Sequence, residues 1–237
     1  MNKFNIDFYA LSDIGRVRTQ NQDNYIVIDN GEKGFLAGVW DGVGGCDDGK
    51  FASKTACEFS EKFFLENFSK SSDNIFTIKE KVENINLKAH LHIKELSNTD
   101  DKTYQTTSSI LYIKDKNYFI SHVGDSKIFL LRDNECFLLT KDHTVRESSV
   151  LTQVLGHPND ITCHNVFENI FENDIFLLCS DGLTSFVKKE EISEIIQKEN
   201  SLENSVISLI NLANSRGGTD NITVICLKTS INQAVNK

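Results

Sequence analysis

Four aspartates stand where an apolar run of the chain ends in a glycine or asparagine turn. They are Asp23, Asp41, Asp181 and Asp220, and they come from distant parts of the sequence. Three of them adjoin an apolar run that we expect to be buried, where an unpaired carboxylate costs several kcal/mol to desolvate. No lysine or arginine adjoins them in sequence to neutralise that charge. Four carboxylates that converge from strand ends therefore predict a site for a hard divalent cation.

Each aspartate taken alone has a simpler explanation. Asp-Gly is a frequent turn dipeptide, so Asp41 and Asp181 could each serve only as turn residues. The chain would then be a surface-interaction domain without chemistry of its own. The four residues together, with the apolar runs that flank them, favour the metal site.

The chemistry of such a site follows from its ligands. Oxygen ligands on strand ends favour Mg²⁺ or Mn²⁺ over Zn²⁺. Two such ions about 3.5–4 Å apart can share a carboxylate, activate a water for in-line attack on phosphorus and neutralise the phosphoryl oxygens. Arg18 precedes Asp23 by five residues and could hold a phosphate in the same cleft through two parallel hydrogen bonds. The alternative for Arg18 is an ordinary surface role.

Length, composition and charge limit the class of protein. The chain has 237 residues, of which 39% are hydrophobic, enough for a substantial core. No linker or internal repeat divides it, so we expect residues 1–237 to form a single domain. The formal net charge of -9 argues against a nucleic-acid partner, because phosphate backbones need a basic surface.

The same sequence features predict a location. The N-terminal residues lack the hydrophobic stretch of a signal peptide, and the longest apolar runs are too short to cross a bilayer. Six cysteines without a CxxC pair indicate reduced, packed thiols. We therefore expect a cytoplasmic protein with no membrane partner, and a monomer because no exposed heptad stripe is present.

Hydrophobic periodicity predicts the elements that position these residues. Apolar positions in steps of three and four predict helices over 52–63, 78–96, 192–196 and 202–213. Alternating or continuous apolar runs predict strands over 4–10, 25–28, 35–39, 108–113, 118–123, 127–131, 136–139, 175–179 and 222–227, with another near Val166. This order suits two packed sheets with helices outside.

Eight segments also occur in the order of a known motif series. They resemble the motifs of the metal-dependent serine/threonine phosphatases, the protein phosphatase 2C family, from about Ser12 to Leu227. The resemblance implies an α+β fold in which two packed antiparallel β-sheets are flanked by helix pairs, a four-layer sandwich. The Asn-, Lys- and Ile-rich composition is typical of bacterial members. The segments are SDIGRVRTQNQDNY, VWDGVGG, TTSSILYI, VGDSKIFLLR, LTKDHT, VLTQVLG, LLCSDGL and GGTDNITVICLK.

The resemblance implies a ligand role for each core aspartate. Asp41 matches the ligand that bridges both metals, and Asp181 and Asp220 match ligands of the first metal. The main-chain carbonyl of Gly42 matches a ligand of the second metal, and Asp23 matches the residue that holds its waters. Two Mn²⁺ or Mg²⁺ ions are therefore expected.

The resemblance also implies the reaction. Arg18 matches the arginine that binds the substrate phosphate, and Asp125 matches the carboxylate that binds a third, weaker metal in some members. The expected activity is hydrolysis of phosphoserine and phosphothreonine in proteins by a water that the two metals activate, without a phosphoenzyme. The expected partners are phosphoproteins and an opposing serine/threonine kinase.

Several positions depart from the family pattern. Gln22 stands where a glutamate is usual, which predicts weaker binding of the second metal. Ser185 replaces a further aspartate, which counts against the third metal, and Val43 stands where some members have histidine. The segment 144–153 is much shorter than the usual flap, so we expect an open cleft.

A rival interpretation keeps the family but not the activity. The chain would be a catalytically weak or inactive member that binds phosphoproteins as a regulatory module. The presence of all four core aspartates together with Arg18 favours the enzyme, because a binding module has no chemical need for that set.

Overall fold

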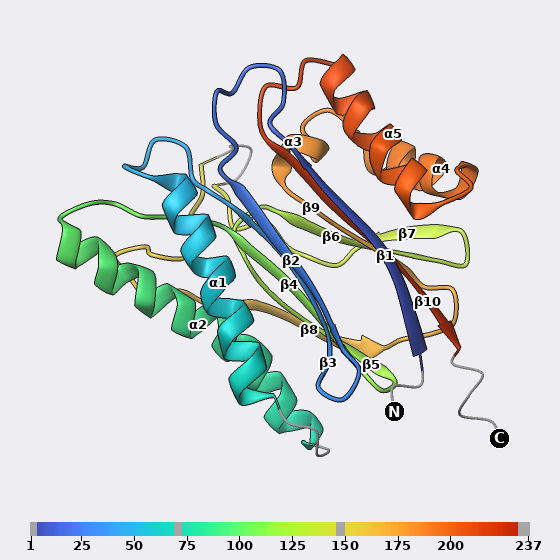
Figure 1. Cartoon of the computed structure of the whole chain (residues 1–237), viewed down its shortest axis with the longest axis horizontal. Coiled ribbons are helices and arrows are strands. Elements are labelled where there is room, and N and C mark those ends of the chain that lie inside the picture. Colours follow the sequence, from blue (N-terminus) through green and yellow to red (C-terminus); the bar gives the residue numbers. More distant parts are fainter. Residues whose placement is uncertain (1–3, 69–72, 146–149, 232–237) are drawn as a thin grey trace.

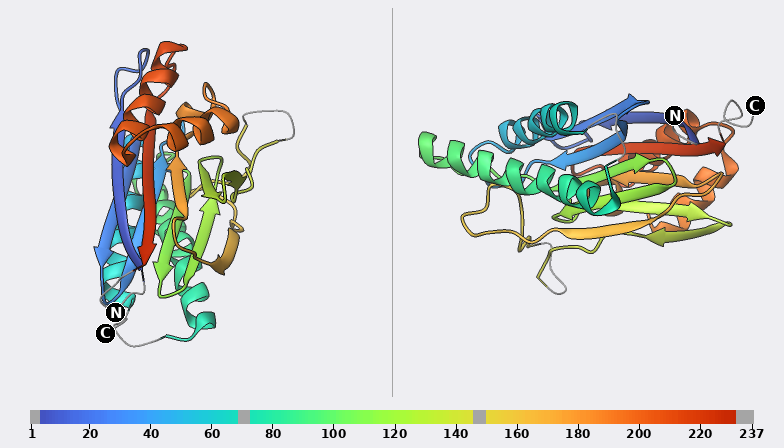
Figure 2. Two further views of the ribbon diagram at one scale, coloured as in Figure 1. Left: turned by 90° about the vertical axis from the view of Figure 1, so that its right-hand side faces the viewer. Right: turned by 90° about the horizontal axis from the view of Figure 1, so that it is seen from below.

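The computed structural model describes residues 4–68, 73–145 and 150–231. Within these ranges the strands form two five-stranded sheets in which every neighbouring pair is antiparallel. The sheets pack face to face and helices cover their outer faces (Figures 1 and 2). The predicted α+β fold of two antiparallel sheets flanked by helix pairs is confirmed.

The first sheet, here called sheet I, has the strand order β2-β3-β4-β5-β8. In its β2–β3 ladder Asp23 lies directly opposite Asp41, so two of the predicted carboxylates are neighbours at one end of the sheet. Strand β3 is buried along almost its whole length, which explains its continuous apolar sequence. The strands are β2 (Asp23–Asn30), β3 (Gly34–Asp41), β4 (Ser108–Lys114), β5 (Asn117–Val123) and β8 (His164–Asn169).

The second sheet, here called sheet II, has the order β1-β10-β9-β6-β7. Strand β9 ends just before Asp181, and β10 begins just after Asp220. Because β9 and β10 are antiparallel neighbours, these two aspartates lie at the same end of sheet II. The strands are β1 (Phe4–Asp13), β10 (Ile222–Ile231), β9 (Ile175–Cys179), β6 (Lys127–Arg132) and β7 (Glu135–Leu138).

Helices α1 (Gly49–Asn67) and α2 (Ile75–Asp100) cover sheet I. Helices α4 (Lys189–Lys198) and α5 (Leu202–Ser215) cover sheet II. Polar caps begin the long helices: the Asp48 side chain accepts a hydrogen bond from a backbone N–H of α1, and that of Asn74 does so for α2. None of the helices in the described ranges is long and apolar enough to span a membrane.

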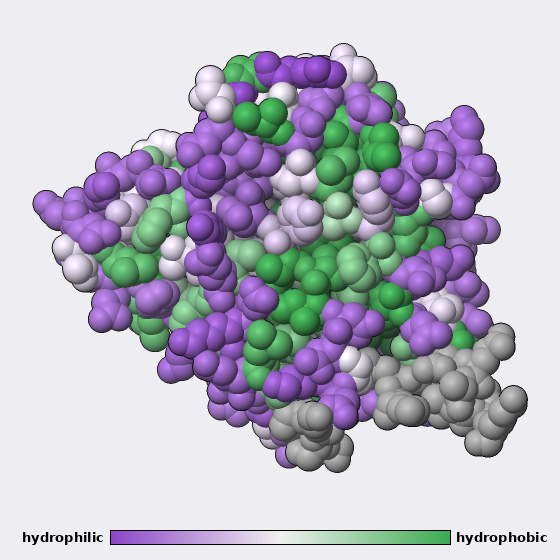
Figure 3. Space-filling view, in the orientation of Figure 1, coloured by the Kyte–Doolittle hydropathy of each residue, from purple (hydrophilic) through white to green (hydrophobic). Residues whose placement is uncertain are grey.

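Three apolar clusters fill the spaces between the four layers. One lies between the sheets and includes Phe35, Leu111 and Phe176. The others join each sheet to its helices, around Trp40 for sheet I and around Leu209 for sheet II. An apolar strip is visible over β1 and β2 (Figure 3), where both sheets have an edge strand. The core thus holds the two sheets in a fixed relation, and with them the aspartates at their ends.

Neither Asp-Gly pair closes a hairpin. Strand β3 leads from Asp41 through a loop into α1, and Asp181 begins the short helix α3 (Asp181–Thr184), which the periodicity did not predict. Glycine is needed after Asp181 because a Cβ at Gly182 would lie 2.0 Å from the carbonyl oxygen of Asn221. The simpler explanation of these aspartates as hairpin residues is therefore wrong.

Candidate metal centre

A pocket of about 280 Å³ lies at the end of the sandwich where the predicted residues meet. Its carboxylates come from both sheets, because Asp41 ends β3 in sheet I while Asp181 and Asp220 lie next to β9 and β10 in sheet II. Asp125 reaches it from the connection between β5 and β6. The residues that line the pocket are Arg18, Asp41, Gly42, Val43, Gly44, Thr107, Asp125, Leu151, Asp181 and Asp220.

Asp23 and Gln22 were predicted for the same site but do not line this pocket. Asp23 is buried, with 7% of its surface exposed, and lies opposite Asp41 in the β2–β3 ladder. Gln22 adjoins the site through its backbone: its carbonyl accepts hydrogen bonds from the Gly42 N–H (3.2 Å) and the Ser53 hydroxyl (2.5 Å). The structure therefore places Asp23 next to the pocket residue Asp41 but outside the pocket wall, and Gln22 also lies outside that wall.

Burial and mutual repulsion raise the pKa values of these carboxyl groups. Burial raises the pKa of Asp41 well above its ordinary value, and the charges of Asp23 and Asp181 raise it further. Burial raises the pKa of Asp23 to about 6, and it raises that of Asp125, with the charge of Asp181, to about 7. The pKa of Asp181 is raised by burial and by Asp220. A bound cation would offset the mutual repulsion of these carboxylates. Burial would then be the remaining cause of their raised pKa values.

The protein itself supplies little positive charge here. Arg18 Nη2 donates to Asp220 Oδ2 at 2.8 Å, and both side chains are partly exposed. Lys127 lowers the pKa of Asp125 and Asp181, but its ammonium group lies 2.5 Å from Oδ2 of Asp142. The carboxylates around Asp41 therefore exceed the cations that reach them.

The donor set fits a hard divalent cation. The polar side chains that line the pocket offer oxygen ligands and one guanidinium, without cysteine or histidine. Oδ1 of Asp23 is buried and has no hydrogen-bond partner, which marks an oxygen still able to take a cation or its water. Among the described residues, no group of three or more His, Cys, Asp or Glu side chains is arranged as it stands to hold a metal. Because like charges repel, these carboxylates would have to draw together on a cation.

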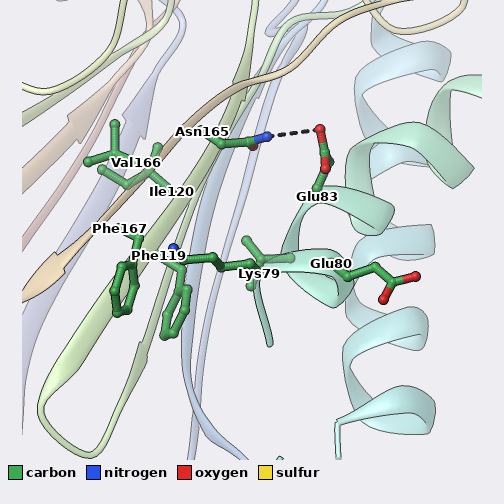
Figure 4. A pocket seen from close by; sticks show the side chains of 9 residues that line it. Lys79, Glu80, Glu83, Phe119, Ile120, Asn165, Val166 and Phe167 are labelled. Atoms are coloured by element: carbon green, nitrogen blue, oxygen red, sulfur yellow. Dashed lines mark hydrogen bonds between the residues drawn. The ribbon is translucent and has the colours of Figure 1, made fainter. Parts of the chain in front are cut away.

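A larger pocket, of about 470 Å³, lies between α2 and strands β5 and β8 (Figure 4). Phe119 and Phe167 form part of its wall, and Lys79 Nζ lies 4.1 Å from the centre of the Phe167 ring. Asn165 Nδ2 donates to Glu83 Oε1 at 2.8 Å (Figure 4). The charged groups of this larger pocket are not clustered like the aspartates of the smaller pocket. Pocket volume alone therefore does not identify the candidate site.

Several residues of the site were not predicted. Thr107 lines the pocket, and its hydroxyl accepts a hydrogen bond from the Asp41 N–H at 3.0 Å. Ser180 and Thr223 donate hydrogen bonds to Oδ2 of Asp23. Their position in the sequence could have identified Ser180 and Thr223, since Ser180 precedes Asp181 and Thr223 follows Asp220 by three residues.

The segment predicted as a shortened flap is described only in part, because residues 146–149 lie outside the described ranges. The two arms of the segment pair: Thr144 and Leu151 form an antiparallel bridge, and the Val145 N–H donates to the Val150 carbonyl at 2.9 Å. Leu151 contributes to the pocket wall. One arm of the short segment thus reaches the pocket.

Comparison with known proteins identifies a family. The model of the family described as "Protein phosphatase 2C" matches residues 15–217. The serine/threonine phosphatase stp of Listeria welshimeri is 28% identical, covering 94% of this chain and 95% of that protein. The Streptococcus agalactiae serine/threonine phosphatase structure has a TM-score of 0.85 at 28% identity, covering 96% of this chain and all of that one. The catalytic domain of the phosphatase PstP, solved with two manganese ions, has a TM-score of 0.78 at 26% identity, covering 96% and 99%.

Proposed function

Because the chain belongs to the protein phosphatase 2C family, we propose that it hydrolyses phosphoserine and phosphothreonine in proteins. The observation that carries this proposal is one pocket in which carboxylates from both sheets meet an arginine. Carboxylates suit divalent cations, and a guanidinium suits a phosphate. The same pocket therefore contains carboxylates that suit a divalent cation and a guanidinium that suits a phosphate.

The aspartates would hold two Mn²⁺ or Mg²⁺ ions. Asp41 would bridge them, Asp181 and Asp220 would bind the first, and the Gly42 carbonyl would bind the second. When bound, such ions supply positive charge to the phosphoryl oxygens and lower the pKa of a water to near neutrality. A relative, PstP, was solved with two manganese ions, which supports this number. We also propose a third, weaker ion at Asp125. Ser185, the residue that replaces a further aspartate of the family pattern, does not line the pocket.

Arg18 binds and orients the phosphate. Its side chain is 43% exposed, and one nitrogen, Nη2, donates to Asp220. A guanidinium has five N–H donors in a planar fork, so other donors remain for a phosphate. Arg18 would thus place the phosphorus atom next to the carboxylates.

Direct attack by water suits the side chains around the pocket. Ser126 is fully buried, and its hydroxyl pairs with that of Thr107 at 2.8 Å. Cys179 is fully buried, and burial raises the pKa of its thiol to about 12. Neither is available as a nucleophile. In the proposed reaction water forms a bond to phosphorus, the bond between phosphorus and the serine or threonine oxygen breaks, and a proton from the water passes to that leaving oxygen, so that no phosphoenzyme forms.

The wider assignments follow from this activity. We propose that residues 1–237 form one phosphatase domain that acts in the cytoplasm as a monomer. Its substrates would be phosphoproteins made by an opposing serine/threonine kinase. The net charge of -9 argues against a nucleic-acid partner.

Phosphate release from p-nitrophenyl phosphate and from a phosphothreonine peptide tests the proposal. We expect the purified protein to hydrolyse both with Mn²⁺ and neither with excess EDTA. The rival regulatory module would bind the phosphopeptide without turnover at any Mn²⁺ concentration, and that result would overturn the proposed activity.

A further inference from the structure

Two hydroxyl groups hold Asp23 across the gap between the sheets. Asp23 begins β2 in sheet I, whereas Ser180 follows β9 and Thr223 lies in β10, both in sheet II. Ser180 Oγ and Thr223 Oγ1 each lie 2.7 Å from Oδ2 of Asp23. Asp23 is 7% exposed, and both hydroxyl residues are fully buried. The contact therefore joins the two sheets at the end that carries the pocket.

The hydrogen-bond chain has a fixed direction. An ionised carboxylate only accepts, so the single proton of Thr223 points to Asp23. The contact of 2.7 Å between Ser12 Oγ and Thr223 Oγ1 must then have Ser12 as its donor. Ser12 Oγ in turn accepts from Asn21 Nδ2 at 2.8 Å. A connected chain of hydrogen bonds of this kind holds the Asp23 side chain in one orientation.

This arrangement leaves the two oxygens of Asp23 unequal. Oδ2 accepts two hydrogen bonds, and Oδ1 is buried without a partner. A buried carboxylate oxygen left unpaired is costly, so its orientation must be imposed by the groups that hold the other oxygen. Of the two oxygens, Oδ1 is the one left for a cation or its water.

We infer that Thr223 and Ser180 are positioning residues for metal binding. They fix Asp23 of sheet I against sheet II, so the open oxygen keeps its place relative to Asp181 and Asp220. The inference rests on the proposed function and deepens it. Two hydroxyl side chains would determine how accurately the residues of a site divided between two sheets are positioned.

Titration calorimetry of Mn²⁺ binding to the full chain tests this inference. Thr223→Val removes the hydroxyl and keeps the side-chain shape, and we expect it to weaken Mn²⁺ binding about 10–100-fold. Thr223→Ser keeps the hydroxyl and should bind nearly as the wild type does. Should Thr223→Val fail to fold, Ser180→Ala removes the other donor and should also weaken binding.

Thr229→Val is a matched control on the same strand. Thr229 is fully buried in β10 like Thr223, and its hydroxyl donates to the Phe171 carbonyl at 2.7 Å, away from the pocket. Both variants lose a buried threonine hydroxyl, so a purely structural effect would appear in both. We expect Thr229→Val to lower the melting temperature but to leave Mn²⁺ affinity unchanged.

A double-mutant cycle with Asp23→Asn completes the test. If Thr223 acts through Asp23, Thr223→Val should add little loss of Mn²⁺ affinity in the Asp23→Asn background. Equal losses in both backgrounds, or a Thr223→Val protein that binds Mn²⁺ like Thr229→Val, would overturn the inference. Failure of the proposed function would look different: the wild type would bind Mn²⁺ and hydrolyse no phosphopeptide.

Discussion

Single side chains at the pocket explain why this end of the molecule needs a cation. Asp41 has Asp23 opposite it in the ladder, and the charges of Asp23 and Asp181 both raise its pKa, so its charge is opposed from two sides. Among the residues that the structure describes, the guanidinium of Arg18 donates a hydrogen bond to Asp220 alone. A folded protein keeps such an arrangement when a ligand relieves it, and repulsion of this kind is typical of functional sites.

Gln22→Glu is the sharpest change at the scale of one residue. It introduces the acid that the family resemblance implies beside Asp23, and changes in residues that hydrogen-bond a metal's ligands or waters typically move metal affinity about 10–100-fold. We expect the Mn²⁺ concentration for half-maximal activity to fall. Gln20→Glu adds the same charge in the same loop, where the side chain is exposed, and should change it little.

The structure makes this a demanding test, because the Gln22 side chain does not line the pocket. An unchanged or higher half-saturating concentration in Gln22→Glu would show that position 22 acts only through its carbonyl. The carbonyl contacts with Gly42 and Ser53 would then be its whole contribution to the site.

Among the elements, those with clear periodicity were predictable and those set by tertiary contacts were not. The helix faces around Ala52 and Ile78 and the buried run of β3 match α1, α2 and β3. Helix α3 has only four residues, too short for any period to show. Its start at Asp181 depends on the close approach of Gly182 to Asn221, which no local pattern reveals.

The candidate site was likewise predictable only where a local sequence pattern marks its residues. The carboxylates and Arg18 could be found because each sits at a strand end or in a recognisable motif. The partners of Asp23 could not, because Ser180 and Thr223 are 157 and 200 residues away from it in sequence. Contacts at such separations come from sheet packing, which a single sequence does not display.

The short segment 144–153 yields a prediction at the scale of an element. Its arms pair with each other, and of the described residues in this segment (144, 145 and 150–153) Leu151 is the one that lines the pocket. Recognition should therefore depend mostly on the phosphate, and weak binding should tolerate varied flanking residues. Steady-state kinetics on a panel of phosphoserine and phosphothreonine peptides measures this.

We expect kcat/KM to vary less than about a hundredfold across the panel, which corresponds to roughly 2.7 kcal/mol. A peptide with its phosphorylated residue kept and its flanks scrambled is the control. Larger discrimination would mean that the segment or its surroundings select the substrate, contrary to an open cleft.

For the whole molecule, three histidines link stability to pH. His122 is fully buried between β4 and β8, its Nδ1 lies 2.8 Å from the Ser109 hydroxyl, and its ring lies 5.3 Å from that of His143 and 6.4 Å from that of His164. Burial, with these two neighbours, lowers the pKa of His122 to about 3. In the unfolded chain His122 therefore binds a proton near pH 6.5, whereas in the folded protein it binds one only near pH 3.

This difference predicts that acid destabilises the fold through His122. Its contribution is fully present above pH 6.5 and falls by about 1.4 kcal/mol per pH unit below it. The metal-free site works in the opposite direction, because the raised pKa values of Asp23 and Asp125 stabilise the fold at low pH and that contribution is lost as the pH rises towards 6–7.

Comparison of wild type with His122→Asn separates the two effects, since both proteins share the aspartates. Urea unfolding in EDTA between pH 7.5 and 5 should show the stability advantage of the wild type shrinking as the pH falls. An advantage that stays constant over this range would mean that His122 is not held neutral in the folded state.

The division of one site between two sheets is the main feature of the whole molecule. Sheet I brings Asp23 and Asp41, and sheet II brings Asp181 and Asp220. The apolar layer between the sheets therefore sets the distances between the proposed metal ligands. On this account the fold and the chemistry depend on the same packing, and Asp41 lies where both meet.

The replacement Asp41→Asn is the change that bears most on a site divided between the two sheets. It removes one charge from the residue proposed to bridge both ions and changes little else in shape. Mn²⁺ binding by calorimetry and phosphate release from a phosphothreonine peptide are measured together, with the exposed Asp29→Asn of β2 as control. We predict two bound Mn²⁺ and full turnover in the wild type and the control, and loss of both in Asp41→Asn. An Asp41→Asn protein that kept more than about a tenth of the wild-type rate, a loss below ~1.4 kcal/mol, would contradict the account.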